Sequence, residues 1–258
     1  GAGSSLVNPT KQPEAIMDVI GESGVDVIAY EQGYIRNRKP NKKLMKAAIE
    51  AARKADVVLF FGGLDEISES EGLDRTHMRM PQAQIELIEK VSAVNKNVVV
   101  VLSAGSSVEM PWADRVAAIV HGYLGGQAGA SAMLDVLTGA TCPSGKLNET
   151  YAYSLEDVAS TSYYPAIERS SEYREGLYMG YRYFDTAGVK VRFPFGFGLS
   201  YTTFAYSDLA VDGGGVTFTI TNTGECDGAE IAQMYVGHER SHLFGPKKEL
   251  KGFVKVFL

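Results

Sequence analysis

The chain has 258 residues, of which 45% are hydrophobic and 22% are charged, and its formal net charge is −6. These values are ordinary for a globular protein and permit a core of normal size. The acidic balance and the lack of a long basic run argue against a nucleic-acid surface, which needs clustered Lys and Arg. No apolar run approaches the ~20 residues that span a bilayer, so we expect no membrane partner.

From residue 13 to residue 139, helical and strand patterns alternate along the sequence. Apolar residues at helical spacing predict helices, and short apolar runs stopped by glycine predict strands covered on both faces. The predicted elements are a helix over 13–24, a strand over 25–30, a helix over 41–55, a strand over 56–63, a helix over 81–95, strands over 97–105 and 116–123, and a helix over 127–139. This alternation indicates an α/β fold with a mostly parallel sheet sandwiched by helices.

Three loops leave the predicted strands at one edge of that sheet, over 62–75, 103–112 and 122–129. Ligands of open parallel sheets bind outside the carboxyl ends of the strands. The first loop contains SESEGLDRTHM (68–78), which places Glu69, Glu71, Asp74 and Arg75 within seven positions. A carboxylate on such a loop is a candidate for acid/base chemistry. The alternative is a structural ion pair in which Arg75 binds Asp74 or Glu71.

The character of the sequence changes after Pro143. Residues 151–206 lose clear periodicity and gain aromatic side chains, which we interpret as packing residues. Beyond them the period becomes two, over 216–224, 229–237 and 249–258, as in short antiparallel strands. Only three or four strands fit where a β-sandwich needs about seven, so we expect a partial antiparallel β-sandwich. We place the domain boundary between an α/β domain over 1–204 and the partial β-sandwich over 205–258.

The sequence offers little for a metal or a cofactor. Cys142 and Cys226 are the only cysteines and lie far apart, which is weak support for a disulfide, and no Cys/His spacing is typical of zinc. GAGSSL (1–6) suggests a dinucleotide fingerprint, but its sixth position is Leu6 and no strand precedes it. We therefore expect no metal and no cofactor.

Six motifs in order resemble those of glycoside hydrolase family three, the β-glucosidase family. They are ESEGLDR with MPQAQIELI, VVVVLSAGSSVEMPW, AIVHGYLGGQAGASAMLDVLTGATCPSGKL, YREGLYMGYRYFD, FPFGFGLSYTTF, and ITNTGECDGAEIAQMYVG with GPKKELKGF. The resemblance implies that the first part is that family's flavodoxin-like α/β sandwich, and that residues from about 205 begin its fibronectin-type-III-like domain. The family usually starts this domain with a strand just before GAGSS, so we expect the sheet to lack one member.

By this resemblance the catalytic pair is split between two domains. The nucleophilic aspartate belongs to a TIM barrel that this chain does not contain, and the acid/base glutamate comes from the loop with Glu-Gly-x-Asp-Arg. Glu71 is therefore the acid/base candidate, and Glu69, two residues earlier, is the alternative. Asp74 and Arg75 are expected to hold the loop in shape.

The resemblance also sets the expected partners. These are β-linked glucosides or oligosaccharides, the TIM-barrel domain of the same enzyme, and further copies in a homo-oligomer. The alternative function is a non-catalytic carbohydrate-binding or domain-interface module. The start of the chain has no signal-peptide pattern and both ends look like cuts inside a longer protein; we expect a cytoplasmic protein.

A chain that carries only one member of a split catalytic pair should not turn over substrate. We predict that the 258 residues alone do not hydrolyse an aryl β-glucoside, because the nucleophile that forms the glycosyl-enzyme intermediate is missing. Release of the aryl group in a continuous absorbance assay checks this. Appreciable turnover by the purified 258-residue chain would contradict the split site.

Overall fold

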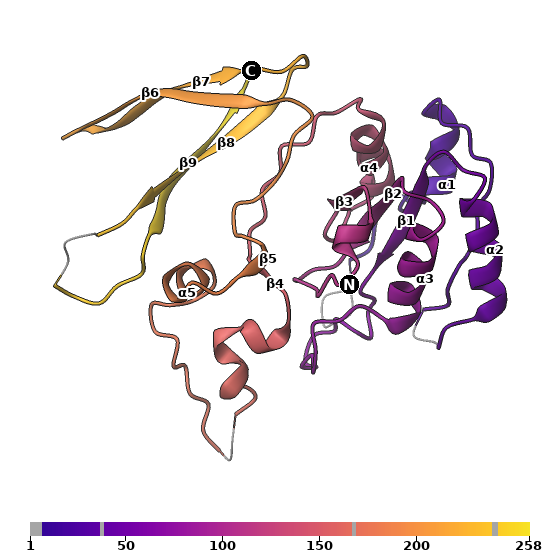
Figure 1. Cartoon of the computed structure of the whole chain (residues 1–258), viewed down its shortest axis with the longest axis horizontal. Helices are drawn as coiled ribbons and strands as arrows, with labels where there is room; N and C mark the ends of the chain where they lie inside the picture. The colour runs from indigo at the N-terminus through magenta and orange to yellow at the C-terminus, as the bar shows by residue number, and fades with distance from the viewer. Residues whose placement is uncertain (1–6, 37–38, 167–168, 239–241) are drawn as a thin grey trace. The chain divides into compact units, whose positions relative to one another are not determined.

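A computed structural model describes residues 7–36, 39–166, 169–238 and 242–258 (Figure 1). The chain divides into two compact units, Gly1–Leu134 with Ala152–Leu155, and Asp135–Tyr151 with Glu156–Leu258. This division follows contacts in space, whereas the expected boundary at residue 204 follows a change of sequence period, and that boundary stays a prediction. The GAGSSL segment lies outside the described residues. No helix among those described is long and apolar enough to cross a bilayer.

The first unit is built on a three-stranded parallel sheet, which confirms the α/β prediction. Its strands are β1 (Val58–Gly63), β2 (Val98–Ser103) and β3 (Ala118–His121), in the order β1-β2-β3. Val58 pairs with Val98, and Leu102 pairs with His121, so all three strands end at one edge. The helical segments are α1 (Ile16–Val19), η1 (Ile20–Glu22), α2 (Lys42–Ala52), α3 (Gln82–Ser92), η2 (Ala113–Arg115) and α4 (Gly129–Thr138), which runs into the second unit.

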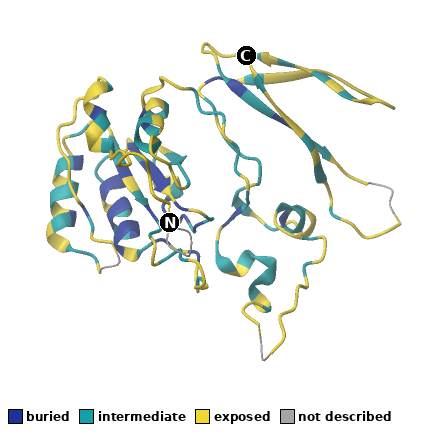
Figure 2. Ribbon diagram, turned by 180° about the vertical axis from the view of Figure 1, so that it is seen from behind, coloured by how far each residue is buried: buried dark blue, intermediate teal, exposed yellow. Residues whose placement is uncertain are grey.

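Local sequence explains why these elements form. Four of the six residues in β2 are buried, as expected for a β-branched central strand covered on both faces. The side chain of Asn41 caps α2 by accepting hydrogen bonds from the amides of Lys43 and Leu44, at 3.0 and 3.2 Å. Buried residues concentrate in β2 and along α3 (Figure 2). The core of the first unit therefore lies between this helix and the sheet.

The predicted strand over 25–30 does not form. Residues 25–30 have no ladder partner among the described residues, and Ile28 and Tyr30 are exposed. A cavity of about 680 Å³ separates this segment from β1, and Val27, Ile28, Leu59 and Phe61 are among its lining residues. An apolar, β-branched sequence predicts a strand, but a strand forms only where a neighbour supplies its hydrogen bonds. The cavity lies at the free edge of β1.

Among the described residues, the second unit contains the helix α5 (Tyr181–Ala187) and two antiparallel strand pairs, and a short two-stranded sheet lies at the division between the units. The helical segments are η3 (Leu155–Asp157), η4 (Ala159–Ser162) and α5 (Tyr181–Ala187), of which η3 begins at the division between the units. β4 (Tyr151–Ala152) and β5 (Val191–Phe193) form a two-stranded sheet. β6 (Phe204–Asp212) pairs with β7 (Gly215–Asn222), and β8 (Ala229–Val236) pairs with β9 (Glu249–Phe257), both antiparallel. These two pairs confirm a partial antiparallel β module.

Aromatic residues of the 151–206 segment pack on one another. The rings of Tyr181 and Phe195 stack with centroids 4.7 Å apart, and those of Phe193 and Phe197 stack at 5.2 Å. Such offset contacts stabilise a region that has few long elements. The contacts agree with the interpretation of these residues as packing residues.

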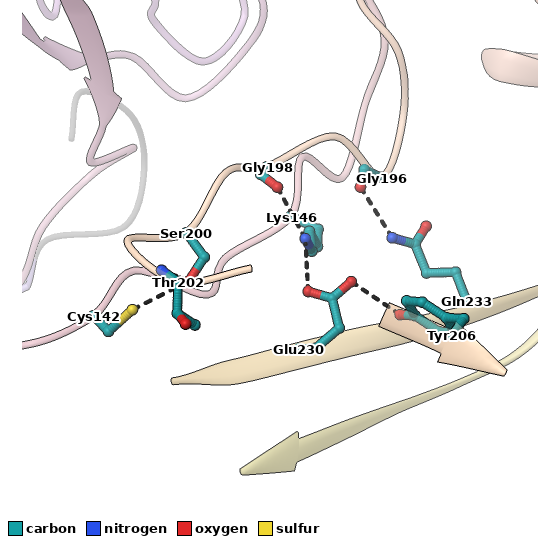
Figure 3. A network of polar contacts seen from close by, with 9 residues as sticks. All are labelled: Cys142, Lys146, Gly196, Gly198, Ser200, Thr202, Tyr206, Glu230 and Gln233. Carbon is teal, nitrogen blue, oxygen red and sulfur yellow. Dashed lines mark hydrogen bonds and ion pairs between the residues drawn. The ribbon is translucent and has the colours of Figure 1, made fainter. Parts of the chain in front are cut away.

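A polar network within the second unit connects β6 and β8 to two irregular segments (Figure 3). The Nζ of Lys146 lies 3.1 Å from Oε2 of Glu230, and the two side chains are only 15% and 14% exposed. Lys146 also donates to the carbonyl oxygen of Gly198 at 2.9 Å, and Tyr206 donates to Oε1 of Glu230 at 3.0 Å. Burial, together with the hydrogen bond to Glu230 and its negative charge, raises the pKa of Tyr206 to about 12.

We predict that Glu230→Gln destabilises the second unit by about 1–3 kcal/mol, because it leaves the largely buried ammonium group of Lys146 without its counter-charge. The free energy of unfolding in urea measures this loss. Glu172→Gln is the matched control in the same unit: its ion pair with Arg174 is exposed, so its loss should cost less than about 0.5 kcal/mol. Equal losses in the two variants would contradict a stabilising role for the network.

Candidate active site

The site is built on the loop that follows β1, residues 64–76, which we name the acidic loop. The start of this loop is fixed by the buried side chain of Gln84 on α3, which accepts from the Gly63 amide at 2.8 Å and donates to the Gly63 carbonyl at 3.0 Å. Gly63 has φ of +148°, and a Cβ there would lie 1.7 Å from the carbonyl oxygen of Ser103. Only glycine lets β1 end this close to the end of β2.

Asp65 shapes the first turn of the acidic loop. Its Oδ1 accepts from the amides of Ile67 and Ser68, at 3.3 and 3.0 Å, and its carbonyl oxygen accepts from the Glu69 amide at 2.9 Å. Burial acts to raise the pKa of Asp65, but these hydrogen bonds and the charge of Arg36 outweigh it and lower the pKa. The turn directs Glu69 toward the loop that follows β2.

Glu69 is held by the loop after β2, residues 104–110, which we name the β2 loop. Its Oε2 accepts from the Gly105 amide at 2.7 Å, and its Oε1 accepts from the Ser106 hydroxyl at 2.5 Å. A Cβ at Gly105 would approach the carboxylate to 3.3 Å, so a side chain there would crowd it. Both oxygens of Glu69 therefore bind the scaffold.

Arg75, near the end of the acidic loop, also binds the β2 loop. Its Nη1 donates to the Ser106 hydroxyl at 2.7 Å and to the Ser107 carbonyl at 3.2 Å. Ser106 thus lies between Glu69 and Arg75. The expectation that Arg75 shapes the loop agrees with these contacts, and Asp74 is exposed beside it.

Glu71 lies on the turn between these two attachment points. The Leu73 amide donates to the Ser70 carbonyl at 3.4 Å, and Gly72 has φ of +76°. A turn that needs positive φ at its third residue and carries glycine there is of type II. Glu71 occupies the second position, and its side chain is exposed. The loop therefore presents Glu71 outward while Glu69 and Arg75 fix its base.

His121, the last residue of β3, joins the same edge of the sheet. Its Nδ1 lies 3.2 Å from the Leu102 carbonyl oxygen, and its ring packs on Tyr123 with centroids 3.8 Å apart. Burial lowers the pKa of His121, while the Leu102 carbonyl and the negative charge of Glu69 act in the opposite direction. His121 is not among the site residues predicted from the sequence. Its position at the end of a predicted strand was the signal that could have identified it.

The arrangement presents the exposed carboxyl group of Glu71 on a turn supported by charged and polar groups from two loops. Within the described part of the chain, no three His, Cys, Asp or Glu side chains are grouped to hold a metal ion. A carboxyl group placed in this way can exchange a proton with a molecule bound beside it.

Comparison with known proteins agrees with this architecture. The model of the glycosyl hydrolase family 3 C-terminal domain matches residues 1–201. The chain is 45% identical to thermostable beta-glucosidase B of Acetivibrio thermocellus, covering 100% of this chain and 36% of that protein. It is 43% identical to an exo-alpha-(1->6)-L-arabinopyranosidase of Bifidobacterium breve, covering 100% of this chain and 35% of that protein.

A crystal structure is equally similar. The GH3 beta-glucosidase of Bifidobacterium adolescentis superposes with a TM-score of 0.94 at 45% identity, over 99% of this chain and 39% of that one. The chain thus spans little more than a third of the length of these relatives.

The electrostatic link between Glu69 and His121 can be tested. We predict that Glu69→Gln lowers the pKa of His121 further below its ordinary value, because it removes the negative charge that favours the imidazolium. An NMR titration of the His121 ring measures this. Glu71→Gln removes the same charge from the exposed turn and should leave this pKa nearly unchanged. A rise in the pKa of His121, or equal shifts in both variants, would contradict the electrostatic effect of Glu69 on His121.

Proposed function

Because the chain belongs to glycoside hydrolase family 3, we propose that it supplies the acid/base carboxylate of a retaining β-glucosidase, and that this carboxylate is Glu71. The observation that carries the proposal is the position of Glu71 on an exposed type II turn whose two sides are fixed by Glu69 and Arg75. A proton donor must be fixed in place and still reach a substrate, and this turn satisfies both needs.

The chemistry proceeds in two steps. A nucleophilic carboxylate attacks the anomeric carbon while Glu71 protonates the leaving oxygen; Glu71 then removes a proton from the water that hydrolyses the glycosyl-enzyme intermediate. In such enzymes the two carboxyl groups lie about 5–5.5 Å apart. The proposal places the nucleophile on a TIM-barrel domain outside these 258 residues.

Glu69 acts in this proposal as a positioning residue. Both of its carboxylate oxygens already accept hydrogen bonds from the β2 loop, so it would have to break these contacts to reach a substrate. Its contacts instead fix the acidic loop two residues before Glu71. This arrangement favours Glu71 over Glu69 as the proton donor.

The proposed substrates carry terminal, non-reducing β-D-glucosyl residues. One relative acts on glucosides by its name, and another, of similar identity, is named for L-arabinopyranosides. Relatives of nearly equal similarity therefore differ in the sugar, as expected if the groups that select the sugar lie mainly outside the region they share with this chain. The Glu71 role does not depend on that choice, because the leaving oxygen needs a proton with either sugar.

We predict that Glu71→Ala, made in the complete enzyme, lowers kcat/KM for alkyl or disaccharide glucosides by about 10²–10⁴-fold, the usual contribution of a general acid. A dinitrophenyl glucoside should be affected much less in its glycosylation step, because its leaving group needs no proton. Added azide should restore turnover and yield a glycosyl azide. Product analysis and steady-state kinetics measure these effects.

Glu69→Ala is the matched control. It should lower activity on good and poor leaving groups alike, without azide rescue, because it loosens the loop and removes no reacting group. Azide rescue in Glu69→Ala instead of Glu71→Ala would reverse the assignment. Full activity in both variants would contradict the acid/base proposal and support the alternative function, a non-catalytic binding or interface module.

A further inference from the structure

Cys142 and Cys226, the only cysteines in the chain, come together in the second unit although they lie far apart in sequence. Both are free thiols, and each contributes to the pKa of the other, as groups do that lie close together. Two cysteines from distant parts of the sequence rarely meet by chance in so large a chain. Their contact has no role in the proposed glycosidase chemistry.

The fold holds Cys142 against the start of β8. Its Sγ lies 3.1 Å from the Ser200 hydroxyl (Figure 3). A Cβ at Gly228 would lie 3.2 Å from this sulfur and 2.8 Å from Cγ2 of Thr202. The missing side chain of Gly228 therefore makes room for the Cys142 thiol two residues from Cys226.

The turn that carries Cys226, between β7 and β8, is also fixed. The Asn222 side chain donates from Nδ2 to the Cys226 carbonyl at 3.0 Å and accepts from the Thr202 hydroxyl at 2.6 Å. The Gly228 amide donates to the Leu258 carbonyl at 2.9 Å. The backbone around Cys226 is thus held by hydrogen bonds and Cys142 is held through its own sulfur, so both thiols have defined positions.

The two thiols differ in reactivity in a complementary way. Burial acts to raise the pKa of Cys142, but hydrogen bonds from Ser200, from the amides of Tyr201 and Thr202, and from Cys226 outweigh it and lower the pKa. Partial loss of hydration at the sulfur and then the negative charge of Cys142 raise the pKa of Cys226, although the residue as a whole is exposed. The first thiol ionises more readily and is the better nucleophile at neutral pH, while the second stays protonated.

We propose that Cys142 and Cys226 form a reversible intramolecular disulfide when the protein meets a peroxide. The Cys142 thiolate attacks the peroxide: an S–O bond forms, the O–O bond breaks, and the departing oxygen takes up a proton to leave as water or an alcohol. The Cys226 sulfur then attacks the sulfenic acid: the S–S bond forms, the S–O bond breaks, and water leaves with the Cys226 proton. Two thiols lose two electrons in total, and the peroxide gains them.

The bond would join the segment after α4 to the turn before β8. A covalent link between such distant residues restricts the unfolded chain and should raise the Tm of the second unit by about 5–10 °C. Disulfides that form and break in a reducing compartment are typical of redox-sensing sites. The inference goes beyond the proposed function and holds whichever glutamate is the acid/base.

The test treats the complete protein with hydrogen peroxide and analyses its proteolytic peptides by mass spectrometry without reduction. The expected product is a Cys142–Cys226 linked peptide that disappears with dithiothreitol, together with a Tm that rises on oxidation and returns on reduction. Separate oxidation of each cysteine to sulfinic or sulfonic acid would overturn the proposal, as would links between different molecules.

Two serine variants separate the roles. In Cys226→Ser, oxidation should stop at the Cys142 sulfenic acid, which dimedone labels, and the Tm should not rise. In Cys142→Ser, Cys226 should still react with peroxide more slowly than Cys142 does, because loss of hydration keeps its thiolate scarce even without the charge of Cys142. Faster oxidation of Cys226 would overturn the assigned order of attack. The linked peptide of the unmodified protein decides the proposal even if a variant folds poorly.

Discussion

The parallel register of β1, β2 and β3 is the constraint on which the site depends. It pairs Gly63 with Ser103 and Leu102 with His121, so three strands end together at one edge. Only the missing Cβ of Gly63 allows the first two strand ends to lie this close. From this edge the acidic loop and the β2 loop leave side by side, and His121 completes it. The contacts of Glu69 with the β2 loop follow from that register.

The charged side chains of the acidic loop have two roles: Glu69 and Arg75 bind the β2 loop, and Glu71 is exposed to solvent. Glu69 and Arg75 both bind Ser106 of the β2 loop, one as acceptor and the other as donor. Charged side chains that bind the scaffold in this way lose their freedom to react, but they fix the turn between them. Glu71 gains a defined position from the contacts of Glu69 and Arg75 on either side of it. A proton-transfer residue benefits from such support, because a small displacement costs much of the rate.

Each unit also leaves apolar surface that its own residues do not cover. In the first unit, the cavity at the free edge of β1 exposes Ile28 and part of Phe61. In the second, Phe253 and Phe257 on β9 are 74% and 78% exposed. A full β-sandwich buries such side chains against a second sheet, and a parallel sheet buries both faces. These surfaces agree with a chain that spans little more than a third of the length of its relatives.

The sequence by itself determined the order and type of most elements, the edge of the sheet that carries the site, and the family. Helical and alternating periods report which face is buried, and strand ends locate the loops. Only the tertiary structure decided that residues 25–30 stay without a ladder, that Glu69 is bound at both oxygens, and that His121 lies near Glu69. It also brought Cys142 to Cys226. The physical reason is common to all four: a local pattern encodes burial, whereas hydrogen-bond partners and charge neighbours come from residues distant in sequence, which only the fold brings together.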